Sequence, residues 1–190
     1  MKKRSIRFQY NAPVIVSFAL LSALALGINI LTGGKANKLL FCVYRCPLRD
    51  ALCYPRFFLH VLGHAGYSHY INNMLLLLVI GPAMEEKHGS KKILIAILVT
   101  AGVAGIVQMV FFPGYALLGA SGIVFMLIVL SSVSGAKNGT VPLTLILVAV
   151  LYVGREVIDM IAVRDDVSQL GHVLGGICGG AFGYAFRSRK

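Results

Sequence analysis

The feature that most constrains this chain is a succession of apolar runs, each about twenty residues long. An α-helix needs about that length to cross the hydrocarbon core of a bilayer. The composition agrees, because 57% of the residues are hydrophobic, 13% are charged and the mean hydropathy is +0.80. Soluble domains seldom combine these values. The sequence therefore predicts an integral membrane protein.

Six such runs divide the 190 residues, and we expect all six to be membrane-spanning helices. They are too long and continuous for the alternating strands of a membrane barrel. The sizeable polar insert, residues 32–56, predicts an outer loop. No repeat or linker marks a second domain, so residues 1–190 are expected to form a single all-α bundle of six transmembrane helices. The helices are expected near residues 12–31, 57–84, 93–112, 117–133, 141–158 and 167–186.

The basic residues of the connections predict how the bundle is oriented. With six spans both ends of the chain share one side of the membrane, and that side carries the larger share of the Lys and Arg residues. We therefore expect a protein of the cell (inner) membrane with both termini in the cytoplasm. The basic start, the first apolar run and Ala23-Leu24-Ala25 also resemble a cleavable signal peptide, which is the alternative for this segment.

We attribute the net charge of +11 to basic residues that orient the protein in the membrane and contact the lipid bilayer. A nucleic-acid partner is not expected, because no basic stripe interleaved with aromatic residues accompanies the charge.

Cys42, Cys46 and Cys53 share the outer loop, whereas Cys178 falls in the last run. The loop can hold one disulfide or three unpaired thiols, and the sequence leaves both open. No metal or cofactor motif is present, so neither is expected.

Polar residues with catalytic chemistry come early in three of the six runs. His64, His69 and Asn73 lie in the second run, Ser121 begins the fourth, and His172 comes early in the sixth. All three runs enter the membrane from the outer side, so these residues are expected at a similar depth. Polar groups at that depth are costly to bury and therefore indicate function. Ser121 is the candidate nucleophile and His172 the candidate base.

Small residues surround this candidate pair. Gly119 and Gly122 flank the serine and leave room for a substrate backbone. A glycine recurs at every fourth residue from 171 to 183, which predicts a helix face that a neighbouring helix can approach closely. If that neighbour carries Ser121, His172 comes within its reach. His69 and Asn73 are four residues apart, so both can donate hydrogen bonds toward one oxygen.

Together these residues resemble the rhomboid family of intramembrane serine proteases. The resemblance covers the second to sixth helices and matches three family signatures in order and placement. They are His64-x4-His69-x3-Asn73, Gly119-Ala120-Ser121-Gly122 and Gly171-His172-x2-Gly175.

The resemblance implies a role for each matched residue. Ser121 and His172 would form a dyad without an acidic third member, and His69, Asn73 and the Ser121 backbone N–H would bind the oxyanion. His64, Gly119, Gly122 and Gly175 would support the site. Phe125 stands where many rhomboids carry a tyrosine stacked on the catalytic histidine, and Tyr44-Arg45 stands where the family often has Trp-Arg.

The function implied by the resemblance is cleavage of membrane-protein substrates within or beside a transmembrane segment. Such segments would contain helix-weakening residues, since a helix shields its own peptide bonds. A non-catalytic rhomboid-like protein that binds membrane clients is one alternative. A transporter that relays protons through His60, His64, His69 and His172 is another, although the apolar runs carry few of the carboxylates that it would need.

Overall fold

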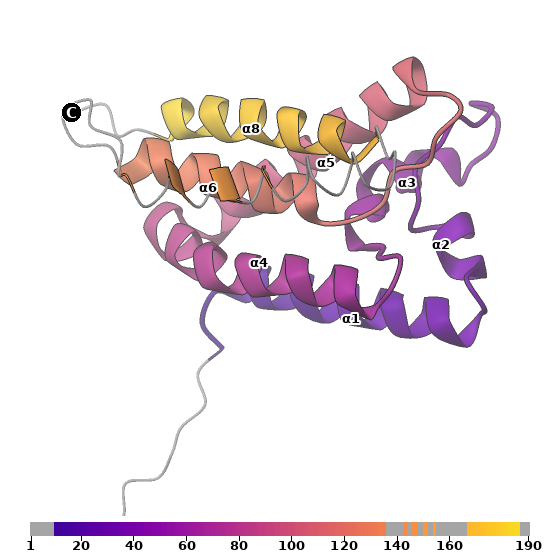
Figure 1. Ribbon diagram of the computed structural model, residues 1–190, viewed down its shortest axis with the longest axis horizontal. Helices are drawn as coiled ribbons and strands as arrows, with labels where there is room; N and C mark the ends of the chain where they lie inside the picture. The colour runs from indigo at the N-terminus through magenta and orange to yellow at the C-terminus, as the bar shows by residue number, and fades with distance from the viewer. Residues whose placement is uncertain are drawn as a thin grey trace, which may run out of the picture.

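The computed structural model describes residues 10–135 and 167–186, together with residues 143, 146, 147, 150, 151 and 154. The described part is helical and contains no β-strand, in agreement with the predicted all-α class. In chain order its elements are α1 (Pro13–Leu31), α2 (Lys35–Leu39), α3 (Cys53–Leu59), the 3₁₀ turn η1 (His60–Leu62), α4 (Tyr67–His88), α5 (Ser90–Phe111), α6 (Ser121–Gly135) and α8 (Val167–Ala185), as Figure 1 shows.

The long helices run lengthwise and are tied together at one end, here called the Glu85 end. There the Glu85 carboxylate of α4 accepts hydrogen bonds from the first N–H groups of α1, Val14 at 3.0 Å and Ile15 at 2.9 Å. His88 Nε2 lies 2.8 Å from Ser134 Oγ of α6. Helices α4, α6 and α8 therefore all run toward the Glu85 end, whereas α1 and α5 start from it (Figure 1). The opposite end, where α6 begins, is called the Ser121 end.

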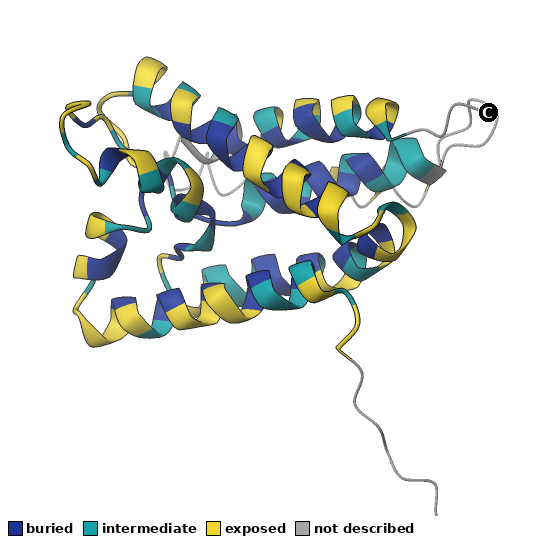
Figure 2. Cartoon of the chain, turned by 180° about the vertical axis from the view of Figure 1, so that it is seen from behind, coloured by how far each residue is buried: buried dark blue, intermediate teal, exposed yellow. Residues whose placement is uncertain are grey.

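Helix α6 is the centre of the bundle. It contacts α4, α5 and α8, and its inner side chains are fully buried. Exposed positions lie on the outer faces of the helices, as Figure 2 shows. Many of them carry large apolar side chains, with Leu31 87% exposed and Val79 75% exposed. A surface of this kind suits contact with lipid tails.

Length and composition mark two of the described helices, α1 and α5, as long and apolar enough to cross a membrane. Helix α6 is apolar but shorter, and the predicted helix 141–158 lies almost entirely outside the described residues. The count of six spans therefore remains a prediction. The predicted bounds 12–31, 93–112 and 167–186 lie close to those of α1, α5 and α8.

The predicted helix 57–84 is wrong at its start. Residues up to Leu62 belong to α3 and η1, and α4 begins only at Tyr67, so His64 precedes α4 instead of lying within it. The break has a tertiary cause at Gly63, where an added Cβ would lie 2.1 Å from the carbonyl oxygen of Phe41. Gly66 then continues the break in a fully extended conformation. The predicted helix 117–133 likewise begins only at Ser121, because Leu117 pairs with Val43 in a two-bond β-bridge.

The loop that was predicted at residues 32–56 is ordered around Arg56, which is 4% exposed. Its Nε donates to the Leu39 carbonyl at 2.9 Å, and its Nη1 pairs with Asp50 at 3.0 Å. The guanidinium also lies 4.7 Å from the ring centre of Tyr44. Arg45, which the resemblance placed in the Trp-Arg position, is exposed. Arg56 is therefore the arginine that holds this loop.

The three loop cysteines form one disulfide and leave one free thiol. Cys46 and Cys53 form a disulfide, and Cys42 is free and buried. Burial raises the pKa of the Cys42 thiol to about 11, although the nearby Arg56 charge acts in the opposite direction. The Cys42 thiol therefore stays protonated at neutral pH, and protonated thiols are poor nucleophiles and metal ligands.

Candidate active site

Ser121 is the first residue of α6, and the turn that leads to it depends on Gly119. The φ angle of Gly119 is +121°, a conformation that side chains rarely allow. Its N–H donates to the His60 carbonyl at 2.9 Å, which fixes the turn against η1. The first hydrogen bond of α6 runs from Val124 N to Ala120 O. The Ser121 N–H therefore belongs to the first turn, where N–H groups have no acceptor within the helix and favour negative charge.

Helix α8 lies directly against α6 along its glycines. A Cβ added to Gly122 would lie 3.0 Å from the carbonyl oxygen of Gly171. A Cβ added to Gly175 would lie 2.2 Å from the carbonyl oxygen of Gly122. Farther along α8, a Cβ on Gly179 would lie 2.4 Å from Met126 O. The condition set by the sequence is met, since the neighbour that packs on the glycine face is the helix that carries Ser121.

His172 lies beside this contact and is 5% exposed. Its chain neighbour Gly171 faces Gly122, which is the chain neighbour of Ser121. The imidazole also packs against Phe125, one turn after the serine, with ring centres 5.8 Å apart at 49°. The fold thus brings Ser121 and His172 to the same level of two touching helices.

His69 approaches Ser121 from a third helix, α4. An added Cβ on Gly119 would lie 2.9 Å from both Cε1 and Nε2 of the His69 ring. The Ala65 N–H donates to His69 Nδ1 at 3.5 Å, so in the neutral ring the hydrogen resides on Nε2, next to Gly119. The fold therefore directs an N–H donor to the residues that precede the serine.

Asn73 lies one turn after His69 and is 3% exposed. Its Nδ2 donates to the His69 carbonyl at 2.9 Å. An amide nitrogen carries two hydrogens, so this bond leaves one N–H for a further acceptor.

Comparison with known proteins identifies the family of the chain. The family model described as Rhomboid domain matches residues 53–189. The chain belongs to the rhomboid family. No curated protein matches it. Family membership and the apolar helices α1 and α5 together make this rhomboid an integral membrane protein.

In this rhomboid, His64 joins the site to the loop of residues 32–56. Its ring meets the His69 ring edge-on, with centres 5.0 Å apart, and its Nδ1 lies 3.1 Å from the Leu62 carbonyl. The Asn37 side chain of α2 donates to the His64 carbonyl at 2.9 Å. The His64 side chain therefore contacts His69 but does not reach the serine through any hydrogen bond described here.

Two polar residues beside Ser121 were not singled out as site residues from the sequence. His60 and Thr100 line a small cavity that also touches Gly119 and Ser121. His60 Nδ1 and Thr100 Oγ1 are buried without a hydrogen-bond partner in the described part of the chain. The cavity volume is about 10 Å³, the smallest that can hold one water molecule. From the sequence, His60 was considered only as a member of the alternative proton relay, and nothing in its apolar run distinguishes Thr100.

Metal binding finds no support in the described ranges. Within them, no group of three or more His, Cys, Asp or Glu side chains could hold a metal ion.

Proposed function

We propose that this rhomboid is an intramembrane serine endopeptidase, in which Ser121 is the nucleophile and His172 the general base. The observation that carries the proposal is the backbone contact of α6 and α8 at Gly122, Gly171 and Gly175, next to both reactive residues. A client-binding rhomboid without catalysis would need neither a serine nor a histidine at these positions.

In the first half of the reaction, Ser121 Oγ attacks the carbonyl carbon of the scissile peptide while His172 takes the hydroxyl proton. The negative charge that develops on the carbonyl oxygen is stabilised by N–H donors from three sources: His69 Nε2, the second N–H of Asn73 and the Ser121 backbone. The tetrahedral intermediate then breaks its C–N bond. The amine leaves with the proton held by His172, and the acyl group stays on Ser121.

In the second half, water attacks the acyl-enzyme and gives its proton to His172. The new acid product leaves as the proton returns to Ser121 Oγ. The cavity lined by His60 and Thr100 adjoins Ser121 and carries polar atoms suited to a water molecule. Its position supports a supply of water to a site that is otherwise surrounded by apolar helices.

The proposed substrates are membrane proteins with a weakened transmembrane helix. A peptide bond in a regular helix is shielded by its hydrogen bonds, so an extended segment must form before Ser121 can attack it. Gly, Pro or other helix-weakening residues near the scissile bond lower that barrier.

The proposal places the Ser121 end of the bundle at the outer face of the cell membrane. The Cys46–Cys53 disulfide belongs to the loop at this end, and disulfides persist outside the reducing cytoplasm. The substrate would therefore be cut near the outer surface.

The test is cleavage of a panel of single-span membrane proteins by the enzyme in liposomes. Wild type is compared with Ser121→Ala, His172→Ala and, as the matched control on the same helix, Ser132→Ala. In the described part of the chain, Ser132 donates its hydroxyl to the Ile128 carbonyl of α6, far from the Ser121 end. Cleavage that disappears in the first two variants and persists in the third supports the protease. Cleavage that survives Ser121→Ala would refute it.

A further inference from the structure

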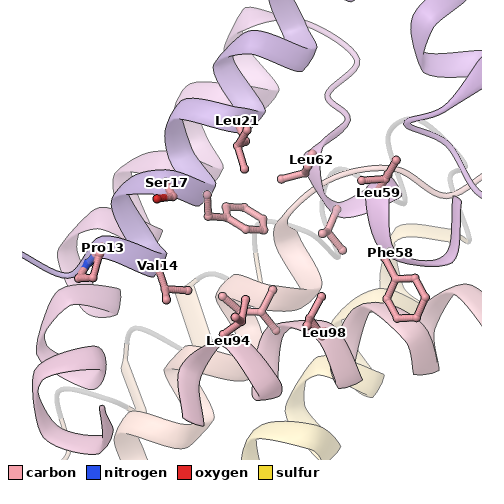
Figure 3. A pocket seen from close by; sticks show the side chains of 12 residues that line it. Pro13, Val14, Ser17, Leu21, Phe58, Leu59, Leu62, Leu94 and Leu98 are labelled. Carbon is pink, nitrogen blue, oxygen red and sulfur yellow. The ribbon is translucent and has the colours of Figure 1, made fainter. Parts of the chain in front are cut away.

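An apolar groove runs along the outside of the bundle between α1 and α5, and α3 and η1 close it toward the Ser121 end (Figure 3). Its cavity volume is about 400 Å³. The walls include Val14 and Leu21 of α1, Leu94 and Leu98 of α5, and Phe58 of α3. Among the described residues that line the groove, Ser17 alone has a polar side chain. Water would find few partners there, so an apolar occupant is favoured.

The groove opens toward the surface that faces lipid tails. Leu21, Leu94 and Leu98 on its rim are 51%, 45% and 43% exposed. Because α1 and α5 also contact each other, a further helix, about 10 Å across, cannot enter between them. A single acyl chain is thin enough to do so. The lining from Pro13 to Leu21 extends about 12 Å along α1, which suits a chain lying parallel to the helices.

The end of the groove near Glu85 carries a positive charge and an interfacial aromatic residue. Lys91 is exposed, and it precedes Leu94 by three residues and Leu98 by seven, so it shares the groove face of α5. Its side chain leans toward the start of the helix and can reach the headgroup layer. The Tyr10 hydroxyl lies 2.7 Å from Ser17 Oγ at the same opening, as is typical of tyrosines at the membrane interface.

The neighbouring lysines are engaged elsewhere. The Lys92 ammonium lies over the Phe186 ring, 5.3 Å from its centre, on the α8 side of the bundle. Lys87 donates to the Ser134 carbonyl of α6. Among the described basic residues at this end, Lys91 therefore supplies the charge that matches an anionic headgroup at the groove.

We propose that this groove binds one acyl chain of an anionic phospholipid, whose headgroup pairs with Lys91 beside Tyr10. The bound lipid fills the gap between α1 and α5. It joins these two helices on the side of the groove, whereas α4 contacts both of them elsewhere. The site is separate from Ser121, so it holds whether or not the protein cleaves substrates.

The test is native mass spectrometry of the delipidated protein in neutral detergent, titrated with palmitoyl-oleoyl-phosphatidylglycerol or with the phosphatidylcholine of the same chains. One phosphatidylglycerol is expected to bind more tightly than phosphatidylcholine. Lys91→Gln should weaken its binding about five-fold, the effect of one lysine near an anionic surface. Lys92→Gln, the matched charge control, should bind like wild type.

A second pair of variants tests the apolar part of the groove. Leu98→Trp fills it and should weaken phosphatidylglycerol binding at least ten-fold. Val99→Trp places the same indole at a neighbouring position that does not line the groove and is similarly exposed, so it should leave binding unchanged. Equal losses in Lys91→Gln and Lys92→Gln, equal binding of the two lipids, or wild-type binding by Leu98→Trp would overturn the proposal.

Discussion

Gly119 does as much for the site as the reactive side chains around it. It turns the chain into α6 with a φ of +121°, and it leaves the space in which the His69 ring lies. One residue therefore sets both the start of the helix that carries Ser121 and the distance to a proposed oxyanion donor.

Gly119→Ala is expected to lower turnover at least ten-fold and to reduce thermal stability. The added Cβ would lie 2.9 Å from His69 Cε1 and Nε2, in a backbone conformation that costs a non-glycine residue about 1–3 kcal/mol. Cleavage rates and melting curves measure the two effects. Gly114→Ala is the matched control, because an added Cβ there meets nothing within 4 Å. Wild-type turnover in Gly119→Ala would show that this contact does not position His69.

Among the elements, the pair α6 and α8 carries the proposed catalytic arrangement through its glycines. Gly175→Ala should lower the melting temperature and abolish cleavage, because its Cβ would lie 2.2 Å from the Gly122 carbonyl oxygen and force the helices apart. Gly180→Ala on the same helix has open space and should be neutral or slightly stabilising, since alanine favours helix. Thermal melts and cleavage assays of the two variants decide this. Similar behaviour of both would contradict the close helix contact.

Helix α1 depends on a cap that comes from α4. Glu85→Ala leaves the Val14 and Ile15 N–H groups without their acceptor, and Glu85 is 3% exposed. The free energy of unfolding should therefore fall by about 1–3 kcal/mol, as measured by denaturation in detergent. Glu86→Ala, at the exposed neighbour, should leave it unchanged. If the two variants lose the same stability, the carboxylate does not cap α1.

Much of this arrangement could be predicted from the sequence, and the limits have physical causes. The length of the apolar runs predicts α1 and α5, and the glycine repeat predicts the contact face of α8. Both can be predicted because each pattern lies within one segment of the sequence. The break before α4 could not be predicted, since Gly63 is required by a backbone far away in the chain, at Phe41. The roles of Arg56 and Thr100 were missed for the same reason, as their partners or cavity come from other elements.

At the scale of the whole molecule, the two ends of the bundle have different chemistry. The Ser121 end holds buried histidines and amides, whereas the Glu85 end gathers the cap of α1 and the lysines of α4 and α5. Exposed basic residues also lie at the Ser121 end, at Lys35, Lys38, Arg45 and Arg49. The two ends therefore differ in their buried polar groups and not in the sign of their surface charge.

The predicted orientation is tested with single cysteines at exposed positions of the two ends. Lys38→Cys should react with a membrane-impermeant maleimide on intact cells, because α2 belongs to the outer loop. Glu86→Cys should react only after permeabilisation. The native Cys42 and Cys178 are buried and provide a low background. The reverse pattern would invert the topology and place the site on the cytoplasmic side.

The most direct measurement is to treat the membrane-embedded protein with a serine-reactive fluorophosphonate and to locate the adduct by mass spectrometry. It requires no substrate and reports only on an activated serine. We predict a single adduct on Ser121, absent from both Ser121→Ala and His172→Ala and retained in Ser132→Ala. A folded wild type that stays unlabelled beside a reactive intramembrane protease, or an adduct that survives His172→Ala, would contradict the Ser121–His172 dyad.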